Sequence, residues 1–227
     1  SIMMYKILRK LPSRYANSLM KMKGSRIAHH GIQRSGTNYI NQCLWRCGIN
    51  PINSFDEKRN SPRHKHCRWY SEKSNIPDFL TEQYGNHFNV SDINELNKVA
   101  GYPCSTVHLV IKKEKLPWLA SIMNWGLACN WFSSKDDALS NLDVLAKDYQ
   151  SYYGFWNDMN CASPKQVEIL RLENLQEDFN LLKQSLAKLG LNLNTGNFNG
   201  KLNVVPMSPS GREEIVNKEE IEFILEC

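Results

Sequence analysis

The chain has 227 residues and carries 28 Lys and Arg against 23 Asp and Glu, a formal net charge of +5 at pH 7. Hydrophobic residues make up 41% and charged residues 22% of the chain, which is enough to fill one core and excludes a disordered or collagen-like protein. The excess of positive charge favours an anionic ligand but is too small to indicate a nucleic-acid surface.

Predicted strands alternate with predicted helices along the chain. The strands are predicted at 26–32, 106–111 and 166–172, and the helices that follow them at 37–47, from Pro117 onward and at 175–189. The apolar residues of each helix recur at helical spacing, and each strand is a short β-rich run. This alternation predicts an α/β fold, a single domain in which helices flank a central parallel sheet.

The segments outside these units are more polar. Residues 53–104 form an inserted loop region with one predicted helix near 91–99, and an aromatic helix face is predicted over 143–156. The C-terminal segment 191–227 is predicted to be irregular apart from a short helix near 218–225. We expect the inserted loop and the C-terminal segment to shape a substrate pocket.

The seven cysteines form no CxxC pair and no small disulfide framework, so we interpret them as mostly buried, reduced thiols. Cys43 and Cys47 are four residues apart and share one helix face. Packing is favoured there over a redox or metal role.

The sharpest local motif is the run from Gly31 to Tyr39, GIQRSGTNY, between a predicted strand and a predicted helix. A glycine-rich turn that enters a helix presents backbone N–H groups and the positive end of the helix dipole to an anion. The spacing G-x-x-x-x-G is that of a Walker A loop, but Thr37 and Asn38 stand where an NTPase requires Lys and then Ser or Thr. This departure disfavours a kinase or an ATPase.

The residues RSGTNY, 34–39, resemble the 5′-phosphosulfate-binding loop of the sulfotransferases that use 3′-phosphoadenosine 5′-phosphosulfate, PAPS. The resemblance implies a P-loop-containing nucleotide-binding fold and a reaction that requires no metal. It also implies that Arg34 contacts the bridging and sulfuryl oxygens and acts in catalysis. The residues that would bind the 5′-phosphate through backbone and hydroxyl groups are Ser35, Gly36, Thr37 and Asn38. Tyr39 would stack on adenine, or else pack on the core face of its helix.

A second match to this family lies at the next strand end. The family pairs a basic residue there with a Ser eight residues later, and Lys113 and Ser121 have this spacing. A dianionic 3′-phosphate needs a fixed charge and a hydroxyl donor that converge on it. Lys112 becomes the ligand if the strand register shifts by one, because neighbouring strand residues face opposite sides. Two features depart from the family pattern: Lys replaces the commoner Arg, and Pro117 lies four residues after Lys113 instead of two.

A third match is Arg171-Leu-Glu-Asn-Leu175, which resembles the R-x-E-D-L segment that many sulfotransferases carry at a strand end. The resemblance implies a structural role for it. The three matches occur in the family's order along the chain.

The catalytic base is predicted in the run from Arg63 to Arg68, RHKHCR. Sulfuryl transfer deprotonates an acceptor hydroxyl as it attacks, and a His suits that task. Relatives place a Lys and a His close together at a strand end between the two cofactor motifs, which favours Lys65 and His66. His64 is the alternative candidate for the base. Lys65 or Arg68 would stabilise the charge of the departing sulfuryl group.

Other interpretations of this run are a carboxylate base elsewhere, or a purely anion-binding role. A zinc site from His64, His66 and Cys67 lacks a fourth ligand at the usual spacing. His29 and His30, in the first strand, are interpreted as packing residues.

The function that we expect is transfer of a sulfuryl group from PAPS to a hydroxyl or amine of a small-molecule or glycan acceptor, with PAP as product. The alternatives are a non-catalytic nucleotide- or nucleic-acid-binding module and a P-loop phosphotransferase. No RRM, KH or zinc-finger signature is present in the sequence, so we expect no nucleic-acid partner. No run approaches the roughly 18 apolar residues of a membrane span. We therefore expect a soluble, cytoplasmic protein, with a lumenal domain of a membrane-anchored protein as the alternative.

Overall fold

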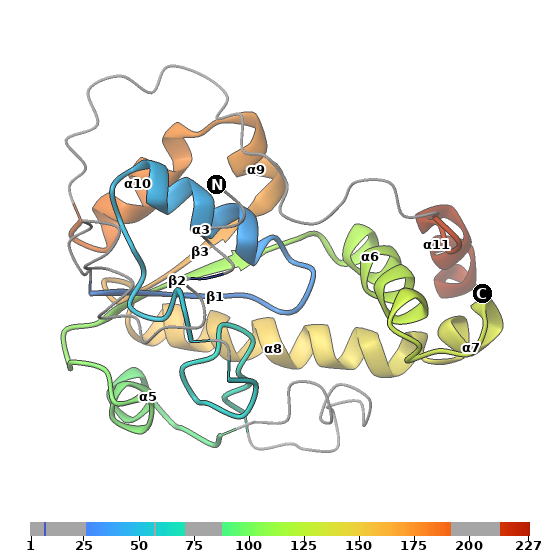
Figure 1. Cartoon of the computed structure of the whole chain (residues 1–227), viewed down its shortest axis with the longest axis horizontal. Coiled ribbons are helices and arrows are strands. Elements are labelled where there is room, and N and C mark those ends of the chain that lie inside the picture. The colour runs from blue at the N-terminus through green and yellow to red at the C-terminus, as the bar shows by residue number, and fades with distance from the viewer. Residues whose placement is uncertain (1–6, 8–25, 57, 71–87, 192–213) are drawn as a thin grey trace.

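The computed structural model describes residues 7, 26–56, 58–70, 88–191 and 214–227 of the chain (Figure 1). Strands and helices alternate over much of this part. The strands are β1 (Ile27–His30), β2 (Val107–Lys112) and β3 (Val167–Arg171). The helices are α3 (Thr37–Arg46), α5 (Ile93–Ala100), α6 (Lys115–Ala128), α7 (Lys135–Ser140), α8 (Leu142–Ala162), α9 (Leu172–Glu177), α10 (Asn180–Lys188) and α11 (Lys218–Glu226).

The strands form one parallel sheet in the order β1-β2-β3. Ile27 pairs with Val107, and His108 pairs with Val167. Because the strands are parallel, their carboxyl ends meet at one edge of the sheet, and α3, α6 and α9 all follow from that edge (Figure 1). The expectation of an α/β fold with a central parallel sheet flanked by helices is confirmed.

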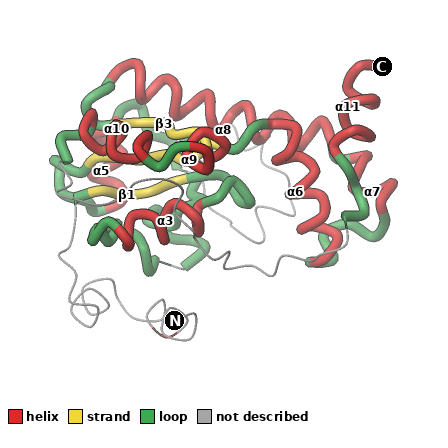
Figure 2. The backbone as a smooth tube through the Cα atoms, turned by 90° about the horizontal axis from the view of Figure 1, so that it is seen from above, coloured by secondary structure: helices red, strands yellow, loops and turns green. Residues whose placement is uncertain are grey.

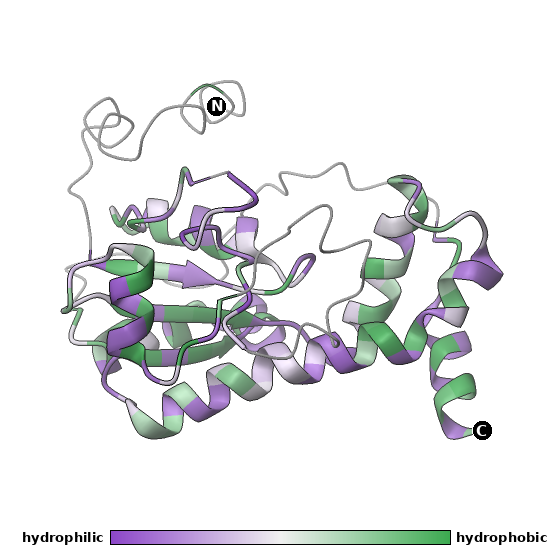
Figure 3. Cartoon of the chain, turned by 90° about the horizontal axis from the view of Figure 1, so that it is seen from below, coloured by the Kyte–Doolittle hydropathy of each residue, from purple (hydrophilic) through white to green (hydrophobic). Residues whose placement is uncertain are grey.

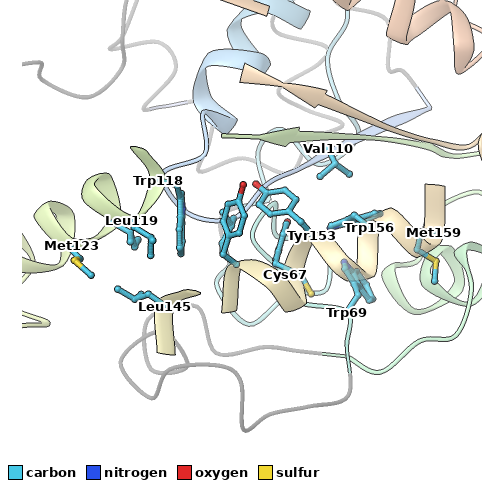
Figure 4. Close-up of a cluster of buried hydrophobic side chains, with 14 of the residues drawn as sticks. Cys67, Trp69, Val110, Trp118, Leu119, Met123, Leu145, Tyr153, Trp156 and Met159 are labelled. Carbon is cyan, nitrogen blue, oxygen red and sulfur yellow. The ribbon is translucent and has the colours of Figure 1, made fainter. Parts of the chain in front are cut away.

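Each face of the sheet has its own hydrophobic cluster, because successive strand residues point to opposite sides. The cluster on the α8 side includes Val110, Tyr153 and Trp156 (Figure 4). The cluster on the other side contains Leu109, with residues of α3 and α10. Figure 2 shows the helices on both sides of the strands, and in Figure 3 the residues of α8 alternate between hydrophobic and hydrophilic. A helix that covers a sheet with one face has this pattern.

The predicted helix at 175–189 is wrong in its boundaries. The structure has two helices there, α9 and α10, separated at Asp178 and Phe179. The break is at Asp178, whose backbone is extended and whose side chain accepts from the Asn180 backbone N–H at 2.9 Å. Helix α6 begins at Lys115, two residues before Pro117, and a proline is tolerated in a first turn because no intrahelical donor is lost there.

The other helix predictions are confirmed, with shifts of one or two residues at their ends, except that α8 runs six residues beyond its predicted end. They are α5, α8 and α11, for the ranges 91–99, 143–156 and 218–225. Helix α7 is an additional six-residue helix whose N-cap, Ser134, accepts a hydrogen bond from the Asp137 backbone N–H. It is too short for periodicity to reveal it.

The side chain of Asn124, on α6, forms hydrogen bonds with the residues just before the C-terminal helix α11. The amide of Asn124 donates to the Val216 carbonyl oxygen at 2.7 Å and accepts from the backbone N–H groups of Ile215 and Val216. Much of the predicted irregular segment, 192–213, lies outside the described residues. None of the described helices is both long and apolar enough to span a membrane.

All seven cysteines are free thiols, but the expectation that most are buried is wrong. Cys104, Cys129, Cys161 and Cys227 are exposed, because they lie near element ends or in loops. Burial raises the pKa of Cys43 to about 12 and that of Cys47 to about 11, which fits packing residues and not reactive thiols.

Candidate anion-binding site

The loop after β1, residues 31–36, turns sharply because two of its residues have a left-handed backbone. Arg34 has φ 67° and Gly36 has φ 98°. A Cβ on Gly36 would lie 2.9 Å from the Leu172 side chain, so only glycine fits this approach to α9. Arg34 has no such freedom, and a non-glycine residue in this region costs about 1 to 2 kcal/mol. Strain of this kind is typical of functional loops.

Helix α3 begins directly after this loop. Its first hydrogen bond runs from the Ile40 N–H to the Gly36 carbonyl oxygen at 3.0 Å, and the Gly36 N-cap supplies no side-chain bond. The N–H groups of Thr37, Asn38 and Tyr39 therefore precede the helical ladder at the positive end of the dipole. The hydroxyl of Ser35 donates to the Ile32 carbonyl oxygen at 2.6 Å. It therefore shapes the turn.

The loop and helix α6 meet through Arg34. Its Nε donates to the Ser121 hydroxyl at 3.3 Å, across 87 residues of sequence. Its guanidinium also lies over the ring of Trp125, 4.9 Å from the centroid. In Figure 1 the loop after β1 extends toward the start of α6. The structure thus brings together the two motifs that the sequence predicts to share one cofactor.

Lys112 and Lys113 face different surroundings. The Lys112 ammonium lies over the rings of Tyr149 and Tyr153, at 5.9 and 5.3 Å. Burial lowers the pKa of Lys113, the charge of Arg34 lowers it further, and Glu173 opposes this shift. The positive charge of Arg34 therefore acts on Lys113. This coupling, together with the contact of Lys112 with the tyrosine rings, favours Lys113 over Lys112 as the second cation of the site.

The turn that contains Lys65 and His66 is bonded to the same loop. The Gly31 N–H donates to the Lys65 carbonyl oxygen at 3.1 Å, and His66 Nδ1 lies 2.6 Å from the Gly31 carbonyl oxygen. The Lys65 ammonium donates to Asn38 Oδ1 at 2.7 Å, at the start of α3. The expectation that this pair lies at a strand end is wrong, because both residues occupy a turn that is held by Gly31.

His66 is a neutral imidazole in this position. A carbonyl oxygen only accepts, so the contact with Gly31 requires the proton on Nδ1 and leaves the lone pair on Nε2. Burial, followed by the charges of His64 and Lys65, lowers the pKa of His66 well below its ordinary value. Burial lowers the pKa of His64 to about 3, and its Nδ1 accepts from the His66 backbone N–H at 3.2 Å.

Arg68 does not have the role that the sequence predicts. Its side chain is buried, and it donates to both carboxylate oxygens of Asp148 at 2.8 and 2.6 Å. It is therefore committed to a structural ion pair and is not available to a departing sulfuryl group. Sequence reasoning missed Asp148, an isolated acid within the aromatic stripe of α8, because no motif marks it.

The histidines of β1 are core residues, as predicted. His29 and His30 are fully buried. His30 Nε2 lies 2.8 Å from His108 Nδ1, and His108 Nε2 lies 2.7 Å from Asn97 Oδ1. As for the zinc alternative, the described residues contain no group of three or more His, Cys, Asp or Glu that could hold a metal ion.

Two other predicted features lie beside the loop. Tyr39 is half-buried against the second hydrophobic cluster, near Cys43, so it uses at least part of its ring in packing. In the third motif, Arg171 pairs with Glu114 at 2.7 Å, and Glu173 accepts from the Glu114 N–H at 3.0 Å. These contacts tie the ends of β2 and β3 together, which agrees with a structural role.

The site therefore gathers Arg34, Lys65 and Lys113 at the carboxyl edge of a parallel sheet, where ligands of α/β proteins bind. Comparison of the chain with protein-family models, with curated proteins and with solved structures gives no significant match.

Proposed function

We propose that the protein is a PAPS-dependent sulfotransferase with a P-loop-type cofactor site. The observation that carries the proposal is the hydrogen bond from Arg34 Nε to the Ser121 hydroxyl, because it joins the two sequence motifs at one edge of the sheet. A ligand with phosphate groups on both the 3′ and the 5′ oxygens of one ribose would need such a pair of neighbouring anion sites.

The two ends of the cofactor would use different residues. The 5′-phosphosulfate would lie at the start of α3, against backbone N–H groups of Gly36, Thr37 and Asn38, with Arg34 on its oxygens. The 3′-phosphate would lie between Lys113 and Ser121. Lys65, which already contacts Asn38, would add positive charge on the 5′ side. Binding would break the Arg34–Ser121 bond, because both groups are needed by the ligand.

The chemical step would be an in-line displacement at sulfur. His66 Nε2 would take the proton of an acceptor hydroxyl while the new oxygen–sulfur bond forms, and the bond from sulfur to the bridging oxygen would break, with PAP leaving. Arg34 would stabilise the charge that develops on the leaving phosphate. A neutral His66 suits the base role, since an imidazolium cannot accept a proton.

The alternative functions have less support. A phosphotransferase would need a Lys at the position of Thr37, and the cations here come instead from Arg34, Lys65 and Lys113. These cations all belong to the loop after β1 or to segments linked to it, which favours a single small anionic ligand over an extended nucleic-acid surface.

We expect PAP to raise the midpoint of thermal unfolding, because a ligand that binds only the folded state stabilises it, and we expect ATP with Mg²⁺ to have little effect. Differential scanning fluorimetry with both ligands at equal concentrations measures this. Stabilisation by ATP with Mg²⁺ and none by PAP would show that the proposed function is wrong.

Lys112 and Lys113 provide a matched pair of variants for this measurement. Lys113→Ala is expected to weaken PAP binding about tenfold or more, by loss of a charge-assisted contact. Lys112→Ala removes the same charge one residue away, where the ammonium faces tyrosine rings, and should bind PAP within about twofold of the unchanged protein. Equal losses of PAP affinity in the two variants would show that the 3′-phosphate does not lie between Lys113 and Ser121.

His66→Asn is expected to lower turnover about 10²- to 10⁴-fold, the usual contribution of a general base. The asparagine amide can still donate to the Gly31 carbonyl oxygen, so PAP affinity should stay within about threefold. Transfer of labelled sulfate from PAPS, in a screen over acceptor classes, measures the rate. His64→Asn tests the alternative base in the same assay, and full activity in His66→Asn would remove His66 as the base.

A further inference from the structure

Gln33, the residue before Arg34, accepts one hydrogen bond on its main chain and another on its side chain. It is only 2% exposed. The indole N–H of Trp118, on α6, donates to its backbone carbonyl oxygen at 2.7 Å. Arg68 Nη2 donates to its side-chain Oε1 at 3.0 Å. One contact fixes the main chain of Gln33, and the other fixes its side chain.

The Arg68 anchor is itself rigid. Its guanidinium forms a two-bond fork with Asp148, and the Tyr70 hydroxyl donates to Asp148 Oδ1 at 2.8 Å. Arg68 is 1% exposed and Asp148 is fully buried. A buried guanidinium that loses its carboxylate is strongly unfavourable, so this pair has one stable arrangement. Gln33 is therefore bonded to a fixed point in the core.

Arg34 needs such support. Its left-handed backbone, with φ 67°, is unfavourable for a non-glycine residue and persists only where its surroundings determine it. The bonds on Gln33 act one residue before that strained position. They also set the direction in which the Arg34 side chain leaves the loop toward Ser121, 3.3 Å away.

We propose that Gln33 is a positioning residue: the buried Arg68–Asp148 pair holds its side chain, and Trp118 holds its main chain, so that the Arg34 guanidinium keeps its place in the anion site. This inference deepens the proposed function and rests on it only for the identity of the anion. It assigns a role in the site to a pair that lies wholly in the core.

The first test needs no ligand. In a ¹⁵N NMR spectrum, the Nε–Hε signal of Arg34, identified by its loss in Arg34→Lys, reports the bond to Ser121. Gln33→Met keeps the length of the side chain but accepts nothing from Arg68, so this signal should shift or broaden. Gln33→Glu keeps the acceptor oxygen and should retain the signal. An unchanged signal in a folded Gln33→Met would overturn the proposal.

Tyr70→Phe is the matched control, because it removes a hydrogen bond from the far side of the same ion pair. It should lower the unfolding temperature and leave the Arg34 signal in place. If Gln33→Met fails to fold, Trp118→Phe tests the same point from the other anchor, since it keeps an aromatic ring but loses the donor to Gln33. If Tyr70→Phe shifts the Arg34 signal as much as Gln33→Met does, the change comes from a general loosening of the core, and the proposal is contradicted.

The second test is a double-mutant cycle on PAP affinity, measured by calorimetry. Gln33→Met should weaken binding about tenfold, about 1.4 kcal/mol, in the unchanged background. In the Arg34→Ala background it should change affinity by less than about twofold, because Gln33 acts through Arg34. Equal effects in both backgrounds would contradict the proposal. If the unchanged protein does not bind PAP, the proposed function fails, and the Arg34 signal still decides the positioning role.

Discussion

Lowering the pH from 7 to 5 is expected to destabilise the folded protein by several kcal/mol. Five imidazoles are buried and neutral in the described structure: His29, His30, His64, His66 and His108. Burial is the largest cause of the lowered pKa in every case, to about 3 for His29, His64 and His108. The pKa of His30 and that of His66 are lowered well below the ordinary value.

The direction of the effect follows from proton linkage. In the unfolded chain these groups bind protons below about pH 6.5, whereas the folded protein excludes them until a much lower pH. The stabilising contribution is therefore complete above pH 6.5 and is lost as the pH falls toward the folded pKa values. His29, His64 and His108 each contribute about 2 kcal/mol between pH 7 and pH 5, and His30 and His66 act in the same direction. A total stability of about 5 to 15 kcal/mol makes this loss large.

Urea unfolding at several pH values measures the effect. Between pH 5 and pH 6, above the titration of most carboxylates, the free energy of unfolding should fall by about 4 kcal/mol or more per pH unit as the pH is lowered. His29→Leu is the control variant, because neither ring nitrogen of His29 has a hydrogen-bond partner and the residue is fully buried. In this variant the slope of the free energy of unfolding against pH should be smaller by the equivalent of about one bound proton. A slope of fewer than two protons in the unchanged protein would contradict the prediction.

Arg34→Ala is expected to abolish most of the proposed transfer activity, with turnover about 10²- to 10³-fold lower. The guanidinium is the group that reaches from the anion loop to Ser121, and no backbone N–H can replace its charge on a leaving phosphate. PAP affinity should fall as well, because the same group contacts the ligand in its ground state. Steady-state transfer of labelled sulfate and calorimetry with PAP measure the two effects separately.

Arg46→Ala is the matched control for this variant. Arg46 ends the same helix that Arg34 precedes, and it is exposed, so its loss changes the net charge equally without touching the loop. It should leave both measurements within about twofold. Arg34→Lys, which keeps the charge, should recover most of the turnover. Activity in Arg34→Ala equal to that of Arg46→Ala would remove Arg34 from the site.

The elements of the fold were predictable where hydrophobic periodicity is strong. Strands β1, β2 and β3 and helix α3 lie within a residue or two of their predicted limits, because a short β-rich run and apolar residues at helical spacing are both local features of the sequence. The break between α9 and α10 was not predictable. It depends on the extended backbone of Asp178, because the apolar spacing continues through this position and does not reveal the break.

The same limit applies to the candidate site. Local sequence marks the anion loop, because glycine spacing and an adjoining helix are local properties. It cannot separate Lys113 from Lys112, since that choice depends on which side of β2 faces the loop. Local sequence also assigned Arg68 to the reaction. Its ion-pair partner, Asp148, is 80 residues away in the sequence, so no local pattern shows that Arg68 is buried.

The sequence by itself thus determined the α/β pattern, the excess of positive charge and the position of the glycine-rich loop before α3. Only the tertiary structure decided that Arg34 meets Ser121, that His66 is bonded to Gly31, and that the guanidinium of Arg68 is buried. The physical reason is the same for each. Hydrogen bonds and charges act over a few ångströms in space, and the sequence alone does not specify which distant residues come within that range.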